Sequence, residues 1–140
     1  MPTFRKQERL CSRRLREQLF KEGKHFTVFP LKVHWMFVHD PLVTAPAQVM
    51  LATSKRKLHH AVQRNRVRRL MRECYRSHKG QIYDWLQQRQ CQLVVSINYI
   101  HTEVVDYHKM YGKFGIATAQ LLQQLQKHTP DKKPDDNLPT

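Results

Sequence analysis

Apolar and polar residues recur with two different periods along the first part of the chain. Over residues 7–22, apolar side chains return every three or four positions, which is typical of an amphipathic helix, and Gly23 stands where that helix would end. Residues 25–39 alternate between apolar and polar, which predicts a strand. Pro30 cannot donate a hydrogen bond to a sheet, so it predicts a break that leaves a short strand and then a longer one.

The remaining elements follow from the same two periods. They are a turn, a strand, a helix, a strand and a last helix, at residues 40–46, 48–53, 61–78, 91–100 and 107–125. The middle helix should end near Gly80. A short helical extension around Trp85 is predicted after that end. The strand after it is the clearest apolar run of the chain, which favours a central place in the sheet. Asp106 can cap the last helix.

Together these elements predict an α+β fold. It is a two-layer sandwich in which one small sheet of about four strands packs against helices, in the order α-β-β-β-α-β-α. Most of the sheet precedes the middle helix, and its most buried strand follows that helix. The middle helix must therefore be the crossover between two parts of one sheet.

Composition predicts a single folded domain over residues 1–128. Apolar residues make up 40% of the 140 residues and only 4 are glycine, which separates the chain from basic disordered tails. Residues 129–140 contain three prolines and no apolar period, so we expect a disordered tail there. No stretch suits a secretory signal or a membrane span, and three cysteines are too few for a disulfide framework. We therefore expect a cytoplasmic protein without a membrane partner.

Positive charge is concentrated in the first part of the chain. The net charge is +14, and residues 1–79 hold 19 Lys and Arg against 5 Asp and Glu, whereas residues 80–140 hold 6 of each kind. A general aid to solubility would be spread over the whole chain. The asymmetry therefore indicates a specific basic surface.

The middle helix places much of this charge on one side. Its apolar side is formed by Val67, Leu70, Met71, Cys74 and Tyr75. Its opposite side is formed by Asn65, Arg68, Arg69, Arg72, Arg76 and Lys79. A merely solvated face would mix both signs, but Glu73 is the only acid between Lys55 and Lys79. We expect this side to bind phosphate, for which the planar guanidinium group is well suited.

The residues do not predict catalysis by the chain's own side chains. Two-metal hydrolysis needs clustered carboxylates, and the eight acids before residue 129 form no D-x-D or E-x-x-E pair. A zinc site could be imagined from His59, His60, Cys74 and His78, but the doubled short-spaced pairs of structural zinc sites are missing. No Gly-rich phosphate loop occurs. We expect no catalytic residue, bound metal or small-molecule substrate on this chain.

Two further groups of basic residues could contact a nucleic-acid backbone. They are the lead-in to the middle helix and a second stripe on the first helix: Lys55, Arg56 and Lys57, and Arg9, Arg13 and Arg16. The second stripe ends in Phe20, on which a base of a single strand could stack. Trp35 could equally line such a groove or pack in the core.

The middle of the chain resembles the protein subunit of bacterial ribonuclease P. The family's mark is an SKK-like element followed by AV-x-RNR and a run of basic and hydrophobic residues. Here it reads SKRK, AV and RNRVRRLMRE, at residues 54–57, 61–62 and 64–73. The likeness extends upstream to LFKEG at residues 19–23 and covers about residues 5–127.

The resemblance implies a ribonucleoprotein endonuclease that removes the 5′ leader from precursor tRNA. The catalytic groups and the Mg²⁺ ions would belong to an RNA subunit, bound 1:1, and the middle helix would make a left-handed crossover. The cleft between the first helix and the sheet would take the leader, at Phe20 and, less directly, at sheet aromatics. The residues implied to bind the RNA subunit are Arg64, Asn65, Arg66, Arg68, Arg69 and Arg72.

Two other functions fit parts of the pattern. A ribosomal or assembly protein could carry the same basic helix without belonging to an enzyme, and the RNA that co-purifies with the chain would distinguish it. A DNA-binding regulator would need a dimer and a base-reading helix after a short turn, which this strand-adjacent arginine helix fits poorly.

Overall fold

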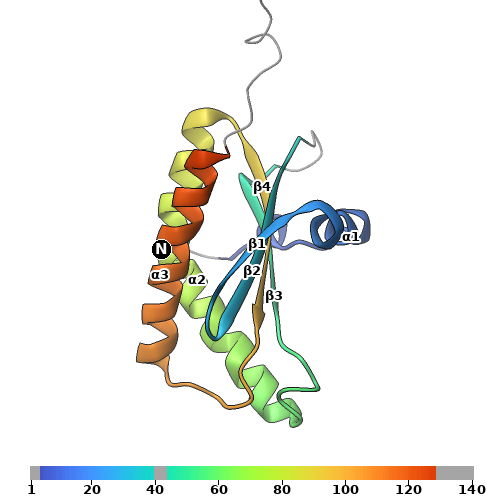
Figure 1. The fold of residues 1–140 in the computed structure, drawn as a ribbon, viewed down its shortest axis with the longest axis vertical. Coiled ribbons are helices and arrows are strands. Elements are labelled where there is room, and N and C mark those ends of the chain that lie inside the picture. The colour runs from blue at the N-terminus through green and yellow to red at the C-terminus, as the bar shows by residue number, and fades with distance from the viewer. Residues whose placement is uncertain (1–3, 40–43, 129–140) are drawn as a thin grey trace, which may run out of the picture.

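The computed structural model describes residues 4–39 and 44–128 (Figure 1). Its elements are η1 (Lys6–Glu8, a 3-10 helix), α1 (Arg13–Glu22), β1 (Lys24–Val28), β2 (Leu31–Val38), β3 (Ala47–Ala52), α2 (Ala61–Arg89), β4 (Gln92–Tyr99) and α3 (Tyr107–Lys127). The predicted order of α-helices and strands is confirmed. The predicted tail at 129–140 and part of the predicted turn at 40–46 lie outside the described residues.

The four strands form one sheet in the order β1-β2-β4-β3. β2 pairs antiparallel with β1 and with β4, while β3 and β4 are parallel. Parallel neighbours need a crossover connection, and α2 provides it, as the sequence predicts. β4 lies between β2 and β3, so the central position predicted for the most apolar strand is also confirmed.

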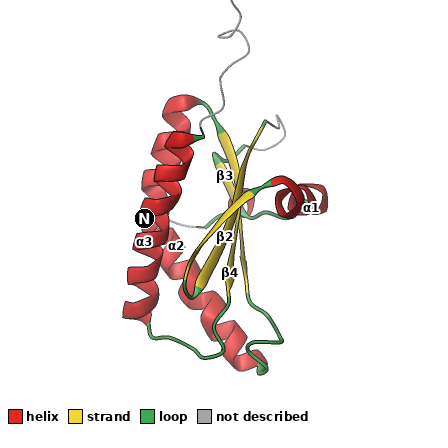
Figure 2. Cartoon of the chain, in the orientation of Figure 1, coloured by secondary structure: helices red, strands yellow, loops and turns green. Residues whose placement is uncertain are grey.

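Helices cover both faces of the sheet (Figures 1 and 2). Alternation along β2 explains this arrangement, because Val33 and Trp35 join the large core under α2 and α3, while Met36 joins a smaller core under α1. Leu15 and Leu19 attach α1 to that smaller core. The α+β fold with a four-stranded sheet is confirmed, and α1 adds a partial layer on the second face.

The first helix is shorter than the periodicity predicts. It begins at Arg13, and the Ser12 side chain caps it. The residues before Ser12 run beside β3 instead, where the Leu10 N–H donates to the Val49 carbonyl oxygen at 3.0 Å and Arg9 forms a β-bridge with Val49. Leu10 is buried in the same small core as Leu15 and Leu19, so it shares their apolar spacing without being part of the helix.

α2 is longer than predicted because it does not stop at Gly80. Gly23 ends α1 as predicted, but at Gly80 the buried side of the helix continues into Trp85 and Leu86, and their burial holds the next turns in place. The helix ends instead at Gln90, which adopts the left-handed conformation with φ 55°.

α3 begins as predicted, since the Asp106 carboxylate accepts a hydrogen bond from the Lys109 N–H at 2.8 Å. It packs beside the later turns of α2, where the ring centroids of His78 and Tyr111 are 4.5 Å apart. The first turns of α2 therefore extend past the start of α3, toward the end of β3 (Figure 1).

Candidate nucleic-acid interface

The outer side of α2 presents three arginines that no other described residue holds. Arg66, Arg69 and Arg72 are exposed, and they make no hydrogen bond or ion pair with the described part of the chain. Val67 and Met71, on the opposite side of the same turns, are fully buried. α2 is thus attached to the core by one side and offers free guanidinium groups on the other, as the sequence predicts.

Two other arginines predicted to bind RNA, Arg64 and Arg68, also support the loop before α2. Arg64 Nη1 donates to the carbonyl oxygens of Leu58 and His59 at 2.9 and 3.0 Å. Arg68 Nη1 donates to Thr53 Oγ1 at 3.0 Å. These bonds join the end of β3 and the loop to the first turns of the helix. Arg64 and Arg68 therefore shape the basic surface, with fewer donors left for a ligand than the exposed arginines have.

The loop itself holds three cations beside the start of α2. Its backbone is folded around Ser54, whose carbonyl oxygen accepts from the Leu58 N–H at 2.9 Å and whose Oγ accepts from the Arg56 N–H at 3.1 Å. Leu58 is buried and anchors the loop, while Lys55, Arg56 and Lys57 are exposed. The two basic segments of the motif thus adjoin one another.

A shallow groove of about 560 Å³ runs along this side of α2. It is lined by Val62, Asn65, Arg66, Arg69 and Leu70. Val62 is 78% exposed, so the groove offers an apolar side chain about one turn before the guanidinium group of Arg66 and about two turns before that of Arg69. A nucleic-acid strand has matching groups, since its phosphates are charged and its sugar and base faces are largely apolar.

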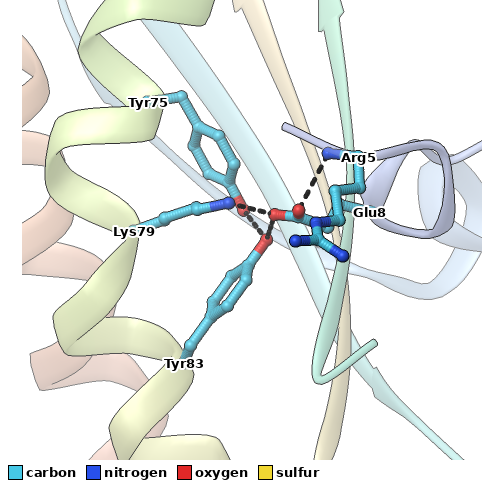
Figure 3. A network of polar contacts seen from close by, with 5 residues as sticks. All are labelled: Arg5, Glu8, Tyr75, Lys79 and Tyr83. Carbon is cyan, nitrogen blue, oxygen red and sulfur yellow. Dashed lines mark hydrogen bonds and ion pairs between the residues drawn. The ribbon is translucent and has the colours of Figure 1, made fainter. Parts of the chain in front are cut away.

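Lys79, which the helical period places with the exposed arginines, is buried in a polar network (Figure 3). Its ammonium group forms an ion pair with Glu8 Oε1. The Tyr83 hydroxyl donates to the same oxygen at 2.7 Å, and the Arg5 N–H donates to Glu8 Oε2 at 2.9 Å. The Tyr75 and Tyr83 hydroxyls are 2.8 Å apart. The assignment of Lys79 to the ligand-binding side is therefore wrong, because Glu8, 71 residues away in sequence, neutralises it.

The network sets the protonation states of its members. Burial alone would raise the pKa of Glu8, but hydrogen bonds from Lys79, the Arg5 N–H and Tyr83, with the charge of Lys79, hold that pKa below its usual 4.5. Burial raises the pKa of both Tyr75 and Tyr83 well above the usual value. At neutral pH the network is thus a carboxylate surrounded by donors, and it fixes the N-terminal segment to α2.

A second surface lies on the sheet face beside α1, and we call it the α1 surface. The strand register places polar side chains of three strands on this face: His25, Thr27, Lys32, His34, Ser96 and Asn98, of which Ser96 is fully buried. Phe20 is 47% exposed, and its ring meets that of His34 edge to face at 4.9 Å. Burial, with the charges of Lys32 and His25, lowers the pKa of His34. The alternation of His25 and His34 with buried residues along β1 and β2 places both histidines on this face.

The predicted basic stripe of the first helix forms only in part. Arg9 precedes the helix, and its guanidinium lies over the Phe4 ring at 5.6 Å. Arg13 is exposed and forms an ion pair with Glu17 at 3.1 Å. Arg16 lies one turn before Phe20 and stays beside the α1 surface. The stripe is incomplete because Arg9 lies in the segment that runs along β3, before the helix begins.

Trp35 belongs to the core and not to a groove. It is 1% exposed, on the sheet face that α2 and α3 cover, and its indole Nε1 donates to Gln124 Oε1 at 2.9 Å. Its assignment to leader contact is therefore wrong, since a base cannot reach the ring.

Replacement of Trp35 by phenylalanine should affect stability alone. We expect the free energy of unfolding to fall by about 1–3 kcal/mol, because ring volume and the bond to Gln124 are lost. Urea unfolding would measure the change. Binding of RNA by the folded variant should equal that of the unchanged protein, and weaker binding in a filter assay would contradict the core assignment.

The candidate zinc ligands His59, His60, Cys74 and His78 do not form a cluster in the structure. Among the described residues, no three His, Cys, Asp or Glu side chains lie close enough together to hold a metal ion. His78 Nδ1 lies 2.8 Å from the Cys74 carbonyl oxygen, and burial, with the charge of Glu73, raises the pKa of the Cys74 thiol to about 11. Within the same part of the chain, no helix is both long and apolar enough to cross a bilayer.

Comparison with known proteins gives one consistent match. Residues 4–113 match the family described as Ribonuclease P. The ribonuclease P protein component of Porphyromonas gingivalis strain W83 is 37% identical over 108 residues, which cover 76% of this chain and 78% of that protein. The component from Chlorobium phaeobacteroides is 42% identical over 83 residues, or 58% of this chain and 57% of that protein.

Two solved structures share the fold. The ribonuclease P protein of Staphylococcus aureus superposes with a TM-score of 0.63 at 14% identity, covering 83% of this chain and 95% of that one. The protein from Thermotoga maritima gives 0.52 at 20% identity, covering 86% and 96%. From the family match, the relatives and the arginine helix in its predicted place, we conclude that this chain belongs to the ribonuclease P protein family.

Proposed function

We propose that this chain binds the RNA subunit of ribonuclease P through α2 and the 5′ leader of precursor tRNA through the α1 surface. As a family member, the chain is a protein component of ribonuclease P and hence a subunit of an endoribonuclease. The observation that carries the proposal is the row of free guanidinium groups at Arg66, Arg69 and Arg72. The planar guanidinium fork is pre-organised, so arginine loses less freedom for each hydrogen bond to phosphate than lysine does.

The mechanism on the α2 side is electrostatic. Each phosphate neutralised by arginine or lysine releases counterions, and the free arginines of α2 act together with Lys55, Arg56 and Lys57 of the loop. Arg64 and Arg68 keep that loop against the helix, so the charges are already in place before RNA arrives. Asn65 supplies a polar side chain within the groove.

The α1 surface suits a single strand better than a duplex. The exposed Phe20 ring offers a stacking face, and Arg16 and Lys32 offer charge nearby. Since α1 and α2 lie on opposite faces of the sheet, the leader and the RNA subunit can bind at the same time (Figure 2). The protein thereby screens the repulsion between two large RNAs and raises the affinity for substrate.

Catalytic chemistry is assigned to the RNA subunit. We propose that the RNA holds the Mg²⁺ ions and the reacting groups, that one protein binds one RNA, and that the complex works in the cytoplasm. The carboxylate of Glu8, buried in this chain, is already occupied by donors and is unsuited to a metal ion. The free cysteines among the described residues are consistent with a reducing compartment.

Reconstitution with the RNA subunit tests the proposal. At moderate Mg²⁺ concentration, where the RNA alone is slow, we expect leader removal from precursor tRNA to be faster with the protein than without it. Equal rates would overturn the proposal. Co-purification of ribosomal RNA in place of one structured RNA and precursor tRNA would support a ribosomal or assembly protein instead.

Replacement of Phe20 by leucine should weaken binding of the leader alone. Loss of one stacked base costs about 1–3 kcal/mol, so the affinity advantage of precursor tRNA over leaderless tRNA should fall about 5- to 150-fold. Fluorescence titration of both tRNAs against the holoenzyme would measure it. Phe29→Leu is the matched control, because Phe29 is 53% exposed but lies in the β1–β2 turn. An equal loss in both variants would contradict the role of Phe20.

A further inference from the structure

We propose that Tyr107, Tyr111 and His78 form a stacking platform for an unpaired nucleotide of the RNA subunit, beside the arginine groove of α2. This inference rests on the proposed function, because it extends the surface that α2 offers to that RNA. The platform joins the first turns of α3 to α2. It lies on the face of the sheet opposite α1, so the leader on the α1 surface cannot be its ligand (Figure 1).

The three rings are close together, and the two tyrosines are exposed while His78 is half-buried. The ring centroids of His78 and Tyr111 are 4.5 Å apart, and those of Tyr107 and Tyr111 are 5.7 Å apart. Tyr107 is 42% exposed and Tyr111 is 41% exposed. Neither hydroxyl bonds to another residue in the described part of the chain. The cluster therefore has faces and donors that no described residue uses.

The platform is also rigid, which lowers the entropic cost of stacking a base on it. His78 is held by the contact of its Nδ1 with the Cys74 carbonyl oxygen at 2.8 Å. Tyr107 begins a helix that Asp106 caps, so its backbone does not fray freely.

Charge around the platform favours an anionic ligand. The first turns of α3 carry Lys109 and Lys113 and, after the capping residue Asp106, no acid. The nearest acid on α2 is Glu73, and Arg76 forms an ion pair with it at 3.1 Å. The arginine groove ends at Leu70, about two turns before His78 on α2, so the platform lies beyond the end of the groove along the same helix. An RNA strand that continues past Leu70 in this direction would reach the platform.

The test is the affinity of the full chain for its RNA subunit, measured by filter binding over a range of salt. The double variant Tyr107→Leu, Tyr111→Leu should bind about 5- to 150-fold more weakly, as expected for loss of one stacked base. The slope of log affinity against log salt should stay unchanged, because no charge is removed. The matched control Tyr107→Phe, Tyr111→Phe keeps the rings and should bind within about threefold of the unchanged protein.

The outcomes separate this inference from the proposed function. If the unchanged chain fails to bind the RNA subunit, the proposed function fails. If it binds and the leucine variant binds equally well, the platform alone is overturned. An equal loss in the leucine and phenylalanine variants would also overturn stacking. Thermal unfolding of both variants checks that a weaker affinity is not caused by a smaller folded fraction.

Discussion

Replacement of Lys79 by methionine should lower the free energy of unfolding by about 3–5 kcal/mol, the usual cost of breaking a buried ion pair on one side. Methionine has similar length but cannot neutralise Glu8, which would stay buried with an uncompensated charge. Urea unfolding at neutral pH would measure the loss. Lys127→Met is the matched control, because Lys127 is exposed at the end of α3 and its loss should cost less than about 0.5 kcal/mol. Equal effects of the two variants would contradict the network.

The pH dependence of stability gives an independent check on the same network. Since the folded-state pKa of Glu8 lies below 4.5, its ionised form stabilises the fold fully above pH 4.5, and this contribution is lost as the pH falls through the folded value. The stability difference between the unchanged protein and Glu8→Gln should therefore shrink below about pH 4.5. A difference that stays constant through the acid range would mean that Glu8 does not titrate in this way.

The Lys79 variant also distinguishes stability from RNA contact. If Lys79 touched phosphate, its replacement would lower the salt slope of RNA binding by about one unit. Because the ammonium group is buried against Glu8, we expect the slope of the folded variant to be unchanged. The network is thus a structural link between the N-terminal segment and α2.

Replacement of Arg69 and Arg72 by glutamine should lower the salt slope of binding to the RNA subunit by about two units, one for each phosphate contact. Both side chains are exposed and make no bond with the described chain, so stability should change by less than about 0.5 kcal/mol. Filter binding across a salt series measures the slope. Arg89→Gln with Lys127→Gln removes the same charge at the far ends of α2 and α3 and should leave the slope near its original value (Figure 1).

Arg68 should behave differently from Arg72, although the helical period places both on the same side. Arg68 donates to Thr53, so Arg68→Ala should also loosen the loop that carries Lys55, Arg56 and Lys57. We expect affinity to fall while the slope changes by less than for Arg72→Ala. Identical slopes for the two variants would show that Arg68 releases its internal bonds to bind phosphate.

The basic helix and the order of the elements follow from the sequence, because both depend on how apolar residues recur within each short stretch of chain. The apolar spacing of Val67 and Met71 dictates which side of α2 is buried, and the opposite side of the same turns is then exposed. The alternation in β2 likewise assigns Val33 to one core and Met36 to the other. The density of the RNRVRRLMRE motif sufficed to indicate the family.

Tertiary structure alone decided which polar residues are buried or paired within the protein and which remain available to a ligand. The helical period places Lys79 and Arg72 on the same side of α2, but Glu8 pairs only with Lys79. Glu8 is brought there because the N-terminal segment is not part of α1 and runs along β3 at Arg9. The alternation along β2 allows Trp35 to line a groove, but α2 and α3 cover the sheet face on which it lies. The physical reason is common to these cases: a period specifies a direction around one element, whereas burial and charge pairing depend on what the rest of the chain places there.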